Sequence, residues 1–145
     1  MKTCGDVMTK NPVCCHPDDT VAKAAKLMKS ENVGSVPVVE DEKTRKLVGI
    51  VTDRDLALKV VAKALDAKAT MVAAVMARKV VTCRAEDDVQ KAVDAMSEHQ
   101  LRRIPIVDGD NKIVGIIAQA DVATRVNQPA KTAEMVKEIS QASAK

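Results

Sequence analysis

The sequence predicts an α+β protein built from two copies of one small unit. Two stretches share the same order of residue types: VGSVPVVEDEKTRKLVGIVTDRDLA and LRRIPIVDGDNKIVGIIAQADVA. Pro37 and Pro105 lie 68 positions apart, and the same offset aligns Cys15 with Cys83. Each copy holds β-branched runs as well as a helical stripe. A unit of roughly 60 residues buries little core alone, so we expect the copies to pack through their sheets with pseudo-two-fold symmetry.

Each copy is expected to run strand, helix, strand, strand, helix. The first strand is a short apolar run, at residues 12–15 and again at 80–83. The first helix follows, because apolar residues recur at i, i+3, i+4 and i+7 after acidic capping candidates. These matching stripes are Val21, Ala24, Ala25, Met28 and Val89, Ala92, Val93, Met96.

The rest of each copy reads as a hairpin followed by a second helix. The hairpins join residues 36–39 to 47–52 and 104–107 to 113–118 through polar turns. The second helices are expected at 53–65 and at 120–127. This gives one repeat at 6–66, a linker at 67–74, a second repeat at 75–127, and a helical tail at 128–145.

The composition disfavours several classes of function. The chain has no Phe, Tyr or Trp, so it has no rings on which single-stranded nucleic acid could stack. Its net charge of +3 comes from 23 basic and 20 acidic residues without a basic run. No leader-like or membrane-spanning apolar stretch is present. We therefore expect a soluble cytoplasmic protein that binds neither nucleic acid nor membrane, with reduced cysteines.

The repeated motif is similar to that of CBS domains arranged as a tandem pair, the Bateman module. The first copy has Val36-Pro37-Val38-Val39 and Gly49-Ile50-Val51-Thr52-Asp53-Arg54-Asp55; the second has Ile104-Pro105-Ile106-Val107 and Gly115-Ile116-Ile117-Ala118-Gln119-Ala120-Asp121. The likeness covers about residues 6 to 126 and extends to stand-alone bacterial CBS proteins. It implies that adenosine-containing ligands, such as AMP, ADP, ATP, S-adenosylmethionine or NAD, bind in the two clefts of the pair. It also implies a homodimer.

The resemblance assigns one cleft to residues of both copies. Asp55 would accept hydrogen bonds from both ribose hydroxyls, and Thr52 would donate to a phosphate or sugar oxygen. Arg102 and Arg103 suit phosphate, because the guanidinium group donates bidentately and stays charged. The predicted ligand-binding residues are Ile50, Thr52, Asp55, Val81, Arg102 and Arg103.

The second cleft is expected to be weaker. Ala118 stands where the first copy has Thr52, and Gly34 and Ser35 stand where the second copy has arginines. The predicted residues of this cleft are Val13, Gly34, Ser35, Ala118 and Asp121. The alternative is structural: Asp55 would favour the helix dipole and Thr52 would be a cap. Arg102 and Arg103 would then be a solvated pair at the start of a strand.

The cysteines allow a further alternative. Cys14, Cys15, His16 and Cys83 would form a soft-metal or redox site if the first strands of the two copies met. Neighbouring cysteines alternate faces on a strand and do not easily chelate together, so buried thiols and no metal are the favoured interpretation.

Three functions follow as hypotheses. The favoured one is a regulatory module that senses an adenosine nucleotide, with Mg²⁺ accompanying ATP and no obligatory cofactor, and that acts on an unknown protein in trans. The second is a dimeric scaffold that binds no ligand. The third is an enzyme using Cys15 or Cys83 with His16, which is disfavoured because the chain has no nucleophile elbow, Walker loop or residue placed to orient the histidine.

Overall fold

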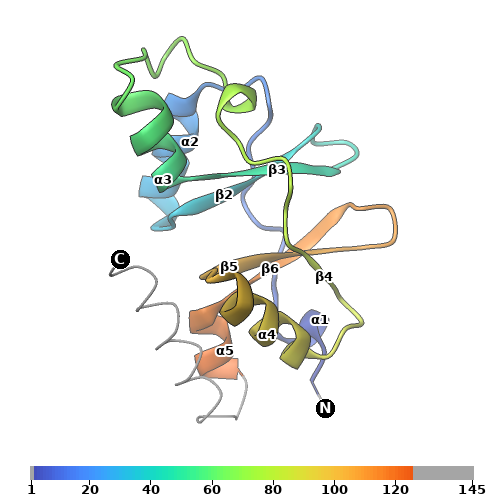
Figure 1. Ribbon diagram of the computed structural model, residues 1–145. Coiled ribbons are helices and arrows are strands. Elements are labelled where there is room, and N and C mark those ends of the chain that lie inside the picture. The colour runs from blue at the N-terminus through green and yellow to red at the C-terminus, as the bar shows by residue number, and fades with distance from the viewer. Residues whose placement is uncertain (1, 126–145) are drawn as a thin grey trace. The chain divides into compact units, whose positions relative to one another are not determined.

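The computed structural model describes residues 2–125, and these divide into two compact units. One unit, Val13–Val80, is called the first-repeat unit below. The other combines the segment up to Pro12 with the chain from Val81 onward, and is called the second-repeat unit. In each unit the longer helices lie on one face of a β-sheet (Figure 1). The predicted α+β class is confirmed.

The first-repeat unit contains a β-hairpin, the helices packed on it and a short helical turn: α2 (Val21–Glu31), β2 (Ser35–Val39), β3 (Leu47–Thr52), α3 (Asp53–Leu56), η1 (Ala57–Val61) and η2 (Val72–Ala74). Helix α2 begins where the Thr20 side chain accepts a hydrogen bond from the Lys23 amide. It ends at Asn32, which adopts the left-handed conformation with φ 55°. Strands β2 and β3 pair antiparallel, with Ser35 opposite Thr52.

The second-repeat unit repeats this plan and adds an N-terminal helix: α1 (Cys4–Val7), β1 (Thr9–Lys10), β4 (Cys83–Arg84), α4 (Val89–His99), β5 (Arg103–Val107), β6 (Ile113–Ala118) and α5 (Gln119–Arg125). Among the described residues its strands form one sheet in the order β1-β6-β5-β4. Strands β5 and β6 are antiparallel, with Arg103 opposite Ala118.

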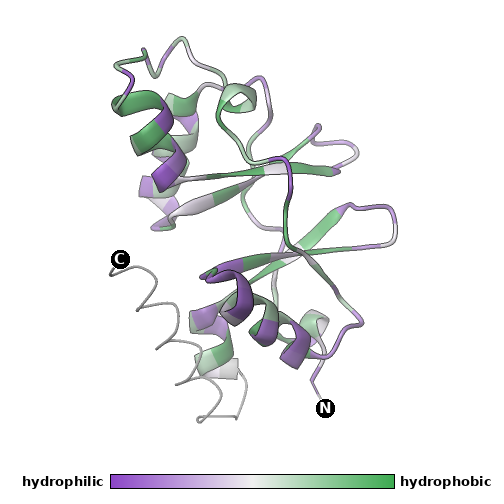
Figure 2. Ribbon diagram, in the orientation of Figure 1, coloured by the Kyte–Doolittle hydropathy of each residue, from purple (hydrophilic) through white to green (hydrophobic). Residues whose placement is uncertain are grey.

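Each unit has its own aliphatic core. In the second-repeat unit the largest fully buried side chains are Met96, Ile104, Ile106 and Ile117. Hydrophobic residues run along the strands, whereas α2 and α4 carry hydrophilic as well as hydrophobic residues (Figure 2). The predicted stripe of α4 is confirmed, since all four of its residues are buried. In α2 the prediction was wrong for Ala25, which is exposed because the buried face of that helix is narrower.

The two sequence repeats exchange the segments that precede their first strands. Strand β1, which comes from the start of the chain, pairs with β6 of the second-repeat unit. The equivalent residue Ala77 exchanges two backbone hydrogen bonds of 2.9 Å with Ile50 of the first-repeat unit. The strands of each repeat are therefore completed by the segment that leads into the other repeat. As a result, the compact units begin and end at different residues from the sequence repeats.

Several expected elements differ in extent. The predicted strand at 12–15 is a single bridge, Cys15 to Val38, because prolines at 12 and 17 remove backbone donors on either side. Its counterpart at 80–83 is reduced to β4. The helix expected to reach Leu65 ends as a π-helical turn at Val61, and Ala64 follows in the left-handed conformation. The tail at 128–145 and the expected end of the last helix, Asn127, lie outside the described residues.

Candidate functional site

Asp55 and Thr52 form a reciprocal cap at the start of α3. The Asp55 amide donates to Thr52 Oγ1 at 3.1 Å, and the Thr52 amide donates to Asp55 Oδ2 at 3.0 Å. This is a capping box, so the structural alternative for both residues is present in the fold. The Asp55 side chain nevertheless keeps 15% of its surface exposed. Each carboxylate oxygen has lone pairs beyond those used by the cap.

Lys59 is a part of this site that the sequence analysis missed. Its Nζ lies 3.1 Å from Asp55 Oδ1 and donates to the carbonyl oxygen of Val75 at 3.0 Å. Lys59 lies in the π-helical turn η1, one turn after Asp55. The i, i+4 spacing of the carboxylate and the ammonium group was a signal in the sequence, whereas the contact with Val75 depends on tertiary structure.

The second repeat has half of the same cap. The Ala118 amide donates to Asp121 Oδ2 at 3.0 Å. Alanine has no hydroxyl that could accept a hydrogen bond from the Asp121 amide. Between them, Gln119 was also missed by the sequence analysis. Its Oε1 is buried and has no hydrogen-bond partner among residues 2–125.

Each hairpin places its other candidate residues beside its own cap. In the first-repeat unit the Asp53 amide donates to the Gly34 carbonyl oxygen at 2.9 Å. In the second-repeat unit the Gln119 amide donates to the Arg102 carbonyl oxygen at 3.0 Å, and Arg103 is opposite Ala118. These equivalent contacts confirm that Gly34-Ser35 and Arg102-Arg103 occupy matching positions.

The candidate residues of each predicted cleft are thus divided between the units. Those on the first-repeat side are Val13, Gly34, Ser35, Ile50, Thr52 and Asp55; those on the second-repeat side are Val81, Arg102, Arg103, Ala118 and Asp121. Val13 is 41% exposed, whereas Val81 is partly buried against the core of its unit. That residues from both units share a cleft stays a prediction.

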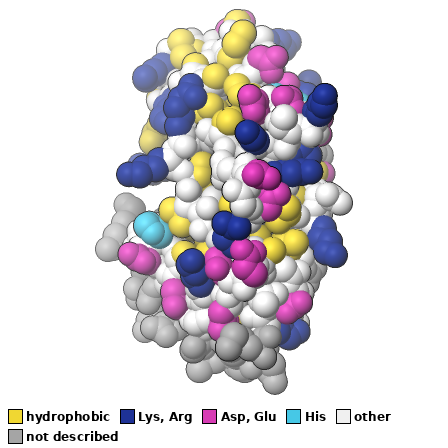
Figure 3. Space-filling model, turned by 90° about the vertical axis from the view of Figure 1, so that its right-hand side faces the viewer, with side chains coloured by type: hydrophobic (Ala, Val, Ile, Leu, Met, Phe, Trp, Pro, Cys, Tyr) yellow, Lys and Arg dark blue, Asp and Glu magenta, His cyan; other side chains and the backbone are white. Residues whose placement is uncertain are grey.

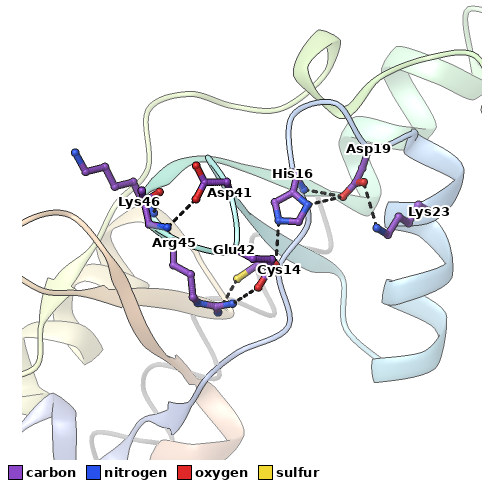
Figure 4. A network of polar contacts seen from close by, with 9 residues as sticks. Cys14, His16, Asp19, Lys23, Asp41, Glu42, Arg45 and Lys46 are labelled. Atoms are coloured by element: carbon purple, nitrogen blue, oxygen red, sulfur yellow. Dashed lines mark hydrogen bonds and ion pairs between the residues drawn. The ribbon is translucent and has the colours of Figure 1, made fainter.

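A polar network occupies the turn side of the first-repeat unit (Figure 4). His16 Nε2 lies 2.9 Å from Glu42 Oε1, and the His16 amide donates to Asp19 Oδ2 at 2.7 Å. Arg45 links Glu42, at 3.2 Å, to the sulfur of Cys14, at 3.5 Å. His16 is therefore held between the carboxylates of Asp19 and Glu42.

The residues of the cysteine alternative belong to different units: Cys14, Cys15 and His16 to the first-repeat unit and Cys83 to the second-repeat unit. Cys15 is fully buried, and burial followed by the charge of Asp19 raises the pKa of its thiol to about 12. Cys83 lies in the other unit, in the same hydrophobic cluster as Cys4, and both thiols are free. Within residues 2–125 no group of three or more His, Cys, Asp or Glu side chains is placed to hold a metal ion.

The surface carries mixed charge. On the face drawn in Figure 3, acidic and basic side chains are interspersed rather than separated into patches. Among residues 2–125, no helix combines the length and apolar character needed to cross a membrane.

Comparisons of sequence identify the same family in both repeats. The CBS domain family matches residues 4–62 and 72–127. The CBS domain-containing protein YhcV of Bacillus subtilis is 41% identical over 128 residues, covering 88% of this chain and 86% of its own. Hypoxic response protein 1 of Mycobacterium tuberculosis is 29% identical over 130 residues, covering 90% and 89%.

Solved structures agree with this assignment. The structure of hypoxic response protein 1 with two coordinated zinc ions matches with a TM-score of 0.77 at 29% identity, over 86% of this chain and 99% of its own. CBSX2 in complex with AMP matches at 0.74 and 29%, over 90% and 99%. The CBS domain pair of protein MJ0100, in complex with 5′-methylthioadenosine and S-adenosylmethionine, matches at 0.73 and 29%, over 86% and 94%.

Proposed function

The chain belongs to the CBS domain family, and we propose that it is a regulatory module that binds an adenosine-containing ligand through Asp55 and Thr52. CBS domain pairs similar to it have been solved with AMP and with S-adenosylmethionine. AMP, ADP or ATP is the favoured ligand, with Mg²⁺ accompanying ATP. The proposed role is regulatory and not catalytic. We propose a cytoplasmic homodimer that passes the binding signal to a separate protein.

The observation that carries this proposal is the geometry of the Asp55 cap. A ribose has two adjacent hydroxyls, which need an acceptor fixed in position. The cap holds Oδ2 of Asp55 and Lys59 holds Oδ1, while the side chain stays 15% exposed. The hydroxyl of Thr52 accepts from the Asp55 amide and keeps its own proton to donate. The proposed site is completed by Ile50 of the same unit and by Val81, Arg102 and Arg103 of the other.

The second cleft is proposed to bind more weakly or not at all. The Asp121 carboxylate accepts from the Ala118 amide, as the Asp55 carboxylate accepts from the Thr52 amide. Ala118 has no hydroxyl to accept from the amide of Asp121, so the second hydrogen bond of the capping box is missing. Gly34 and Ser35 offer no positive charge to a phosphate. The alternative function, a dimeric scaffold without a ligand, predicts that neither cleft binds a nucleotide.

Calorimetry with AMP, ATP and S-adenosylmethionine tests this proposal. We expect wild type to bind at least one of them, Asp55→Ala to lose binding and Asp121→Ala to retain most of it. Asp6→Ala is the matched control, because Asp6 forms the same capping box with Thr3 and has no proposed ligand role. Equal losses in Asp55→Ala and Asp121→Ala would overturn the asymmetry.

A melting experiment separates the sensor from the scaffold. A ligand present at 100 times its dissociation constant stabilises the folded state by about 2.7 kcal/mol. The transition is followed by circular dichroism, because the chain has no Trp or Tyr. No shift with millimolar nucleotides would favour the scaffold.

A further inference from the structure

The residue that begins the second helix differs in charge between the two repeats. Asp53 begins α3 and Gln119 begins α5, and each directly follows the last residue of a hairpin strand. The amide of each donates to the residue that precedes the paired strand. Asp53 donates to the Gly34 carbonyl oxygen at 2.9 Å, and Gln119 donates to the Arg102 carbonyl oxygen at 3.0 Å. The same backbone position therefore carries a carboxylate in one repeat and a neutral amide in the other.

The Asp53 side chain lies against Gly34. A β-carbon at Gly34 would be 3.0 Å from Asp53 Oδ2, so the glycine leaves room for the carboxylate. The other oxygen, Oδ1, accepts from the Arg54 amide at 2.8 Å. Asp53 is exposed, and within the described part of the chain its carboxylate makes no ion pair. The negative charge is thus fixed beside Gly34 and is not neutralised by a neighbouring cation.

The walls of the two proposed clefts therefore differ in the sign of their charge. Arg102 and Arg103 give one wall a positive charge, which suits a phosphate. The other wall, at Gly34 and Ser35, has no cation at these two positions and has the carboxylate of Asp53 beside them. A carboxylate repels a phosphate and attracts a cation, and both effects grow where water is excluded.

We propose that Asp53 determines the charge of the ligand that the second cleft accepts, an assignment that rests on the proposed function. The second cleft takes an adenosine whose 5′ substituent is neutral or positively charged, such as a thioether or a sulfonium, and it disfavours adenosine phosphates. Asp121 binds the ribose, as Asp55 does in the first cleft. The weakness expected toward AMP and ATP then has two causes, which are the missing arginines and an added negative charge.

Three adenosine ligands of different charge test the proposal. In AMP, 5′-methylthioadenosine and S-adenosylmethionine, the group attached at the 5′ position is an anionic phosphate, a neutral thioether and a cationic sulfonium. Asp55→Ala disables the first cleft, and calorimetry at millimolar ligand reaches the weaker one. Adding Asp53→Asn should raise the affinity for AMP roughly fivefold and lower that for S-adenosylmethionine to a similar extent. The affinity for methylthioadenosine should stay the same.

The single variant Asp53→Asn gives a second measurement with the Asp55 cap intact. It should bind AMP at an additional, weaker site that wild type lacks. An asparagine can still accept from the Arg54 amide, and circular dichroism checks the fold.

Asp66→Asn is the matched control. Asp66 is also exposed, its Oδ1 also accepts from a backbone amide, that of Lys68 at 2.9 Å, and it lies beyond η1. It should leave the three affinities unchanged, and an equal response to Asp66→Asn and Asp53→Asn would overturn the proposal by showing an effect of net charge alone.

Failure of this proposal is distinguishable from failure of the proposed function. If wild type binds AMP through Asp55 but Asp53→Asn leaves the ligand preference unchanged, only the role of Asp53 is overturned. The same holds if the Asp55→Ala protein binds none of the three ligands with or without Asp53→Asn. If wild type binds none of them, both proposals are overturned.

Discussion

At the scale of single residues, Asp55 has the capping role that the sequence offered as one alternative, and this role is compatible with the ligand contact proposed above. Its carboxylate accepts from the Thr52 amide and contacts Lys59, and each of these contacts involves a different oxygen. A carboxylate offers about four lone-pair positions, so capping the helix leaves acceptors for a ribose. In the proposed function, the cap serves to orient the ligand-binding group.

Lys59→Met should weaken nucleotide binding while leaving the fold intact. The ammonium group holds one oxygen of Asp55 and ties it to the Val75 carbonyl oxygen, so its loss frees the carboxylate to rotate. We expect an increase in the dissociation constant of roughly fivefold, equivalent to about 1 kcal/mol. Calorimetry gives the affinity and circular dichroism checks the fold.

Lys63→Met is the matched control, because Lys63 is exposed on the chain just beyond η1. It should leave the affinity unchanged. If wild type binds a nucleotide and both variants bind it as tightly, Lys59 does not position Asp55.

At the scale of elements, helices α2 and α4 are preceded by the same hydrogen bonds and ion pairs in the two repeats. Asp19 Oδ2 accepts from the His16 amide, and Asp87 Oδ2 accepts from the Arg84 amide, 68 residues later. Each carboxylate also pairs with a lysine four residues on, Lys23 or Lys91. These contacts lower the pKa of both: for Asp19 they outweigh its partial burial, and for Asp87 the backbone hydrogen bond is the largest cause.

These carboxylates should make stability fall in acid. Because their pKa is lower in the folded state, their contribution is complete above the ordinary pKa of Asp, about 3.9, and is lost as the pH falls through the lowered folded value. The double variant Asp19→Asn, Asp87→Asn should therefore be less stable at pH 7 and lose less stability between pH 5 and pH 2. Chemical denaturation at each pH measures this, and parallel curves for variant and wild type would contradict it.

Close packing explains why each strand motif has a glycine, Gly49 in β3 and Gly115 in β6. A β-carbon at Gly49 would lie 2.8 Å from the Ala77 carbonyl oxygen, and one at Gly115 would collide with the side chain of Met8. Both neighbours belong to the exchanged segments. The motif glycines therefore make room for the exchanged segments, which pair closely with the strands. Neither glycine is needed for a left-handed turn.

At the scale of the whole molecule, the exchange makes each repeat depend on sequence from the other. Cys4 and Val7 contribute to the core of the second-repeat unit, and β1 covers one edge of its sheet. In the same way Val72, Val75 and Met76 contribute to the core of the first-repeat unit.

Removing residues 2–10 should destabilise the second-repeat unit selectively. The deletion uncovers the edge of β6 and removes two buried side chains, so amides of β5 and β6 should exchange with deuterium at least tenfold faster. The amides of β2 and β3 in the same sample are the internal control and should change less. A uniform change across both hairpins, or a larger one in the first-repeat unit, would show that the exchange does not govern stability.

The sequence was sufficient wherever a local pattern has a single physical solution. The hairpin runs, the stripe of Val89, Ala92, Val93 and Met96, and the position of Asp55 at a helix start all follow from periodicity and capping. It was insufficient for the first strands, because one or two bridging residues leave no periodicity. It was also insufficient for Lys59, whose second partner, Val75, is sixteen residues away.

By itself, then, the sequence determined the repeat, the family and the residues proposed to bind a ligand, because these depend on spacing along one chain. The tertiary structure decided which segment completes which sheet, and why Gly49 and Gly115 carry no side chain. Such contacts join residues tens of positions apart, and packing selects them among many pairings that local propensity treats as equal.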